Sequence, residues 1–137
     1  MDPDLVTLVR GAERFSPANY GEALAKRSAL WDTTRKFFDR FELLLTPTLP
    51  VHPFGLGAPE GIPDTVGALP PFPEWLPFTY PWNMTGQPAA TVPCGFTRGG
   101  LPVGLQIVGR RFADATVLRV AAAFEQAQPW AGKRPWL

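Results

Sequence analysis

The longest pattern of apolar residues in this chain has spacings of three and four positions, which is typical of one face of a helix. Ser16 followed by Pro17 is a typical helix start, because a serine can cap the first turn and a proline fits its first position. The pattern then continues to Phe41 without a further proline. It predicts a helix over residues 17–41 with one buried stripe, made of Tyr20, Leu24, Arg27, Trp31, Thr34, Phe38 and Phe41.

Two shorter helices are predicted near the two ends of the chain. Asp2 and Asp4 lie near the start of residues 3–13, and acidic side chains interact favourably with the N-terminal end of a helix. Residues 114–126 place Val117 and Phe124 on one face, and Pro129 lies just beyond. Both segments are therefore predicted to be helices, and residues 114–126 are predicted to bury one face.

Three apolar runs are too short for helices and predict strands. Residues 43–46 form a run that Pro47 stops, which is typical of a buried parallel strand covered on both faces. Residues 89–96 and 103–108 are separated by a segment with two glycines, which predicts a hairpin.

The segment between the first predicted strand and the other two is rich in proline. Most of the seventeen prolines lie between Pro47 and Pro102. Because proline lacks a backbone N–H and fixes φ, residues 47–78 are predicted to form an irregular loop. Long loops in compact domains usually have a use, such as a lid or the wall of a site.

Composition narrows the class of protein. A length of 137 residues with 45% hydrophobic positions fits one domain, and a net charge of +1 predicts no attraction to nucleic acid or to an anionic membrane. The single cysteine, Cys94, excludes an internal disulfide. No apolar run approaches the ~20 residues of a membrane helix, and the first residues do not read as a signal peptide, so we expect a cytoplasmic protein.

Three sequence blocks in a fixed order carry a family resemblance. They are Thr-Pro-Thr at 46–48, Asn-Met-Thr-Gly-Gln-Pro-Ala at 83–89 and Gly-Leu-Pro-Val-Gly-Leu-Gln at 100–106. Together they resemble the C-terminal segment of the amidase signature family, which includes general bacterial amidases and the A-type subunit of glutamyl-tRNA amidotransferase. The resemblance implies an α/β fold in which mixed β-sheet strands are flanked by helices, over one segment that spans residues 1–137.

The resemblance also implies amide hydrolysis by a Ser–Ser–Lys triad, yet no triad residue can be placed in this chain. Only Ser16 and Ser28 are serines, and no Gly-Gly-Ser-Ser loop exists. We therefore expect the C-terminal portion of an amidase that is inactive as a lone chain. The alternative is one half of a split amidase or amidotransferase that needs a partner chain, and a stand-alone binding module ranks third. Exposed aromatic residues on the long helix further predict self-association.

Five residues are candidates for the lining of a substrate pocket: Trp75, Phe78, Thr79, Trp82 and Asn83. The alternative for Trp82 is core packing, and for Asn83 it is a backbone contact in the turn before Gly86. Where A-type amidotransferase subunits carry an acidic residue that grips glutamine, this chain reads Trp-Leu-Pro-Phe at 75–78. That apolar lining favours a general amidase.

The remaining reactive side chains fit structural roles better than chemical ones. His52 is the only histidine and lies in the proline-rich loop, which favours a surface position. Cys94 lies within a predicted strand, where cysteine is usually a small buried hydrophobe. No catalytic residue, metal site or cofactor is therefore predicted. Expected partners are the catalytic part of an amidase or a second copy of the chain.

Overall fold

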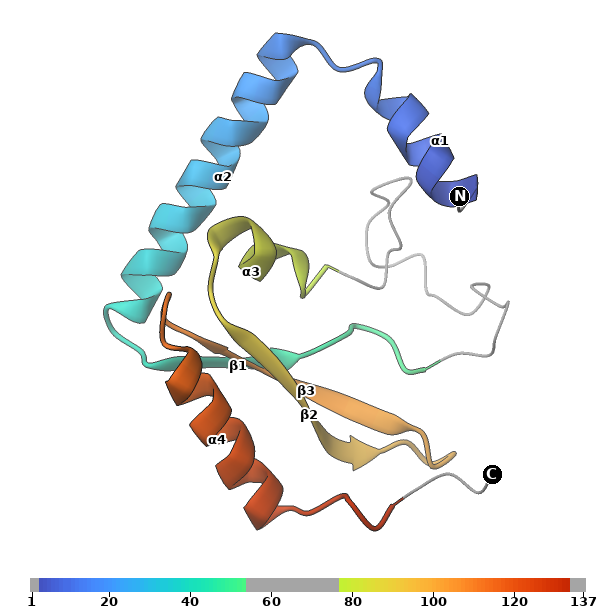
Figure 1. The fold of residues 1–137 in the computed structure, drawn as a ribbon, viewed down its shortest axis with the longest axis vertical. Coiled ribbons are helices and arrows are strands. Elements are labelled where there is room, and N and C mark those ends of the chain that lie inside the picture. The colour runs from blue at the N-terminus through green and yellow to red at the C-terminus, as the bar shows by residue number, and fades with distance from the viewer. Residues whose placement is uncertain (1–2, 54–76, 134–137) are drawn as a thin grey trace.

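The computed structural model describes residues 3–53 and 77–133 (Figure 1). The described part is an α/β fold, as expected, with a small sheet flanked by helices. Its elements in chain order are α1 (Pro3–Ala12), α2 (Pro17–Phe38), β1 (Leu43–Pro47), α3 (Tyr80–Thr85), β2 (Ala89–Phe96), β3 (Pro102–Gly109) and α4 (Asp114–Ala127).

The sheet has the order β1-β3-β2, and β3 pairs antiparallel with both neighbours. β2 and β3 form the expected hairpin, in which the N–H of Thr97 donates to the carbonyl of Leu101 over 2.8 Å. The expectation of a parallel strand at residues 43–46 is wrong, because Leu44 pairs with Val108 in antiparallel register. A short apolar run indicates burial but carries no information on strand direction. Leu45 is in fact 55% exposed, so β1 is not covered on both faces.

Alternate residues of β3 face two different layers of the fold. Ile107 belongs to a core cluster with Val92 and Val117, which lies between the sheet and α4. Gln106 points to the opposite face, where its side chain reaches the backbone just before α3. Figure 1 shows the sheet between α3 on one side and α4 on the other.

α4 packs on β3 at unusually close range. A Cβ atom built on Gly109 would lie 2.6 Å from Cγ2 of Val117, so only glycine allows the helix to approach this far. Val117 is 2% exposed and is therefore held firmly in place. Gly109 also donates its N–H to the carbonyl of Pro88 over 3.0 Å, which fixes the end of β3 against the start of β2.

α2 is capped as expected but ends earlier than predicted, at Phe38 instead of Phe41. Ser16 and Asn19 form a capping box, in which the Asn19 N–H donates to the Ser16 side chain over 3.2 Å. Of the predicted stripe only Thr34 and Phe38 are buried, whereas Trp31 and Phe41 are exposed. The side chains of residues 17–29 are exposed, and Tyr20 is 67% accessible.

α3 is a helix that the sequence reasoning missed, because its six residues are too few to show a helical repeat. It lies between α2 and the sheet (Figure 1), and Nε of Arg27 on α2 donates to the carbonyl of Met84 over 2.7 Å. Most of the predicted loop, residues 54–76, lies outside the described residues. Within the described ranges, no helix has the length and apolar character needed to cross a membrane.

The contact between Gly109 and Val117 generates a stability prediction. We expect Gly109→Ala to lower the free energy of unfolding by about 1–3 kcal/mol, because the added methyl overlaps a buried side chain. Gly99→Ala is the matched control, since its added Cβ would meet nothing closer than 3.7 Å. Urea unfolding measures both variants. The double variant Gly109→Ala/Val117→Ala should lose less unfolding free energy than the sum of the losses of the two single variants, because Val117→Ala makes room for the added methyl. If the two losses simply add, the predicted contact is wrong.

Candidate functional site

Two of the three family-like blocks, residues 46–48 and 100–106, lie side by side where the end of β1 pairs with β3, and residues 83–89 join α3 to the start of β2. Ala89 pairs with Val108, near the other end of β3. Gln106 is 3% exposed, and its Nε2 atom links β1 to the segment before α3 through two acceptors. It donates to Oγ1 of Thr46 over 2.9 Å and to the carbonyl of Phe78 over 2.9 Å.

Thr48, which directly follows β1, and Thr91 on β2 close over the central strand at Gly104. Oγ1 of Thr48 and Oγ1 of Thr91 are hydrogen-bonded at 3.2 Å, and the Thr48 N–H donates to the Gly104 carbonyl over 3.0 Å. A Cβ atom on Gly104 would lie 2.7 Å from Oγ1 of Thr48 and 3.0 Å from Cγ2 of Thr91. The threonine bridge therefore requires glycine beneath it.

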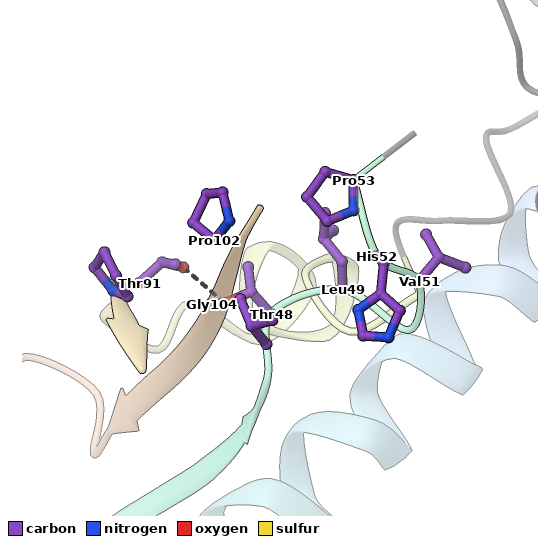
Figure 2. A pocket seen from close by; sticks show the side chains of 10 residues that line it. Thr48, Leu49, Val51, His52, Pro53, Thr91, Pro102 and Gly104 are labelled. Atoms are coloured by element: carbon purple, nitrogen blue, oxygen red, sulfur yellow. Dashed lines mark hydrogen bonds between the residues drawn. The ribbon is translucent and has the colours of Figure 1, made fainter. Parts of the chain in front are cut away.

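A pocket of about 300 Å³ lies beside this threonine bridge (Figure 2). β2 and β3 supply one wall, and the segment after β1 supplies the other with Leu49, Val51 and His52. The lining is mostly apolar, and His52 is its only ionisable side chain among the described residues. The full described lining is Thr48, Leu49, Val51, His52, Pro53, Thr91, Pro93, Pro102, Val103 and Gly104.

The side chains predicted to line a substrate pocket lie elsewhere. Phe78 precedes α3, and Thr79 is its N-cap residue. Trp82 is half-buried and Asn83 is exposed, and both lie on α3. Trp75 lies outside the described residues. None of the four described candidates lines the 300 Å³ pocket, so their role as a substrate wall stays a prediction.

Sequence reasoning missed Thr48 and Thr91 as pocket residues. The signal was present in part, because Thr48 belongs to the Thr-Pro-Thr block and Gly104 to the glycine-containing block on β3. Thr91 carries no such signal, since a single threonine in a strand is ordinary. Only the strand register brings the two hydroxyls to the same side of the sheet.

The serine and cysteine side chains already have structural partners. Ser16 caps α2, and Oγ of Ser28 donates to the carbonyl of Leu24 over 3.0 Å within the helix. The thiol of Cys94 lies 3.5 Å from the carbonyl of Val103, to which it donates. His52, the base that a Cys94 nucleophile would need, is exposed and belongs to the pocket lining, which does not include Cys94.

The three lysines of the chain contact other side chains than the serines. Lys26 pairs with Glu22 at 2.7 Å, and this hydrogen bond holds the pKa of the exposed Glu22 carboxyl below its usual value. Lys36 pairs with Asp32, and Lys133 lies 4.7 Å from the ring centroid of Phe96. Across residues 3–53 and 77–133, no group of three or more His, Cys, Asp or Glu residues could hold a metal ion.

Comparison with known sequences decides the family. The family model described as Amidase matches residues 6–118. The chain belongs to the amidase family. Its relatives include an acylamidase of Rhodococcus erythropolis, which is 43% identical over 140 residues that cover 98% of this chain and 28% of that protein. They also include the A-type subunit of a glutamyl-tRNA(Gln) amidotransferase from Moorella thermoacetica, which is 43% identical over 123 residues and covers 90% of this chain and 24% of that protein.

Solved structures of amidases agree with the fold. A bacterial aryl acylamidase of the amidase signature enzymes is 28% identical with a TM-score of 0.77, and the match covers 99% of this chain and 29% of that chain. The A-type subunit of the Thermotoga maritima glutamyl-tRNA(Gln) amidotransferase is 32% identical with a TM-score of 0.73, over 92% of this chain and 26% of that chain. The expected family is thus confirmed, and the chain spans less than a third of the length of these relatives.

The buried side chain of Gln106 generates the second prediction. We expect Gln106→Leu to lower the free energy of unfolding by about 2 kcal/mol, because Thr46 and Phe78 would lose the donor that satisfies them. Gln126→Leu, on the exposed side of α4, is the control and should change stability by less than about 0.5 kcal/mol. Equal effects of both variants on the urea midpoint would contradict the linking role of Gln106.

Proposed function

We propose that this chain is the scaffold and pocket-wall segment of an amidase, which completes an enzyme that hydrolyses a carbon–nitrogen bond and has no activity as a lone chain. The observation that carries the proposal is the position of its serines and lysines. Ser28 and Lys26 lie on the exposed part of α2, and Ser16 caps that helix. No serine–lysine pair is hydrogen-bonded in the described residues, which hold every serine and lysine of the chain.

Amide hydrolysis requires groups that this segment does not bring together. An activated nucleophile attacks the carbonyl carbon, a base takes its proton, and N–H donors stabilise the oxyanion. Lys26 and Lys36 are ion-paired to Glu22 and Asp32 on the surface, so their amines contact carboxylates instead of a serine hydroxyl. The triad and the oxyanion loop would therefore come from the remaining part of an amidase.

The segment's own contribution would be a rigid, apolar wall. The hydrogen bond between Thr48 and Thr91 ties the two outer strands across Gly104, and Gln106 ties β1 to the backbone before α3. Such fixed side chains hold a substrate in one orientation, and positioning of this kind lowers the barrier of a bond-breaking step. The wall would act on binding geometry without touching the reacting bond.

The lining of the pocket favours amides with an apolar acyl or aryl group. Among the described residues, its lining holds only apolar residues, threonine and glycine besides His52, and no carboxylate that could bind the amino group of glutamine. Relatives named acylamidase and aryl acylamidase support this substrate class, although amidotransferase subunits are equally similar in sequence. From its composition, we still predict that the enzyme works in the cytoplasm.

A split enzyme is the alternative arrangement. The aligned part makes up 28% of the Rhodococcus acylamidase, so most of an amidase would have to come from sequence that this chain does not contain. That part would reside either in the same longer polypeptide or in a separate polypeptide. Exposed Tyr20 and Leu24 on α2 would then be contact residues and would also promote self-association when the partner is absent.

Activity measurements test the proposal. The purified chain alone should release no product from 4-nitroacetanilide above buffer. Addition of the chain to the Rhodococcus acylamidase from which the 140 aligned residues have been deleted should restore hydrolysis. Because neither Ser28 nor Cys94 takes part in the chemistry, the Ser28→Ala and Cys94→Ala variants should restore it to within about twofold.

Two results would contradict the proposal. One is hydrolysis by the lone chain that disappears in the Ser28→Ala or Cys94→Ala variant, since that would place the nucleophile in this segment. The other is the absence of any complex and of any restored activity when the wild-type chain is mixed with the deleted acylamidase.

A further inference from the structure

A second cavity, of about 100 Å³, lies where the last turns of α2 meet the turn after α3 and the turn after β3. It shares no described lining residue with the pocket beside the threonine bridge. Arginine dominates its polar lining, whereas the other pocket is mostly apolar. The described lining is Trp31, Arg35, Phe38, Asp39, Gln87, Arg110 and Arg111.

The side-chain amide of Gln87 has an unpaired atom in this region. Gln87 is 9% exposed, and its Oε1 atom is buried without a hydrogen-bond partner. An unpaired buried polar atom costs free energy, so native proteins keep few of them. Because half a turn of the amide exchanges its oxygen and its nitrogen, Gln87 can present either an acceptor or N–H donors to a ligand. The unpaired amide therefore indicates that a polar group completes the cavity.

The charges of the lining indicate which polar group that is. The guanidinium of Arg35 already pairs with Asp32 at 3.0 Å and with Asp39 at 3.2 Å. Arg110 and Arg111, in contrast, form no ion pair with a carboxylate in the described part of the chain. Three arginines and one aspartate in the lining leave two positive charges in excess. The cavity thus attracts an anion.

The two unpaired arginines are held in place by neighbouring groups. Nη2 of Arg110 donates to the carbonyl of Phe38, the last residue of α2, so the other N–H groups of this guanidinium can serve a ligand. Nε of Arg111 lies 3.5 Å from the position of a Cβ built on Gly86, the residue before the buried amide. The guanidinium carbon of Arg111 also lies 4.8 Å from the ring centroid of Phe112. The planar fork of a guanidinium matches the two oxygens of a carboxylate.

From this arrangement we infer that the cavity is a carboxylate-binding site, in which Arg110, Arg111 and Gln87 donate to the oxygens of the ligand. Its volume leaves room for a small carboxylate. The carboxylate belongs either to a free acid, which is the chemical class that amide hydrolysis releases, or to an Asp or Glu side chain of the amidase part that this chain does not contain. The inference goes beyond the proposed function, because this cavity is separate from the proposed substrate wall.

Acetate and acetamide are a matched pair of probes, since they have nearly the same shape and differ in charge. The wild-type chain is titrated with each at constant ionic strength, and NMR follows the backbone N–H of Gln87 and the Nε–H of Arg111. Acetate should bind with a Kd in the millimolar range, as expected for so small a ligand, and acetamide at least about tenfold more weakly. Equal binding of both probes, or no saturable shift at either group, would overturn the inference.

Two arginine variants with the same net charge separate a built site from general attraction of anions. Arg111→Gln removes a charge of the cavity, and Arg119→Gln removes one from the exposed side of α4. Arg111→Gln should weaken acetate binding by about tenfold, as expected for a lost charge-assisted hydrogen bond, and Arg119→Gln by less than about twofold. Equal effects of the two variants would overturn the inference.

Gln87→Leu tests the amide independently of charge. This variant should weaken acetate binding by about fivefold, because one donor is lost, while the melting temperature stays the same or rises, because an unpaired buried atom is removed. Unchanged acetate affinity of this variant would contradict the role of Gln87 as a ligand-binding residue.

A titration of the complex assigns the source of the carboxylate. The chain is mixed with the Rhodococcus acylamidase that lacks its 140 aligned residues. A free acid is the ligand if acetate still binds in this complex. A side chain of the acylamidase is the ligand if complex formation alone shifts the Arg111 Nε–H and prevents acetate binding. If no complex forms, the proposed function fails, whereas the titrations of the lone chain still decide the inference.

Discussion

The buried amide of Gln106 is the interaction on which the arrangement of the described elements depends. It lies on the central strand and donates both to β1 and to the backbone before α3, so it fixes two elements that are far apart in the sequence. A buried side-chain amide without partners would cost more free energy than an apolar side chain of similar size. The position of the central strand therefore depends on Thr46 and Phe78, which supply the two acceptors for the Gln106 amide.

Close packing on both faces of β3 explains why glycine recurs along this strand. Gly104 lies under the bridge between two threonines, and Gly109 lies under Val117 of α4, so both faces of the strand require a residue without a side chain. The two glycines let different layers approach the same strand from opposite sides. Gly104 and the two threonines that cover it also line the pocket.

The sequence was most informative where a pattern was local. The start of α2 was predictable from Ser16 and Pro17, and the hairpin from the two glycines between its strands, because caps and turns depend on neighbouring residues. The direction of β1 was not predictable, since pairing with β3 joins residues that are distant in the sequence. The pocket escaped prediction for the same reason, because Thr91 is an ordinary strand residue until the register places it beside Thr48.

The uneven anchoring of α2 has a consequence for the local unfolding of this helix. Its second half is anchored through Thr34 and Phe38, whereas residues 17–29 are exposed to solvent. The anchored turns act as a preformed nucleus, so the earlier turns are added by propagation and avoid the unfavourable initiation step. Before Arg27, which donates to the Met84 carbonyl, the persistence of these turns rests on the capping box at Ser16 and on weak surface pairs such as Glu22 with Lys26. The turns before Arg27 should consequently melt and re-form many times during the lifetime of one folded sheet.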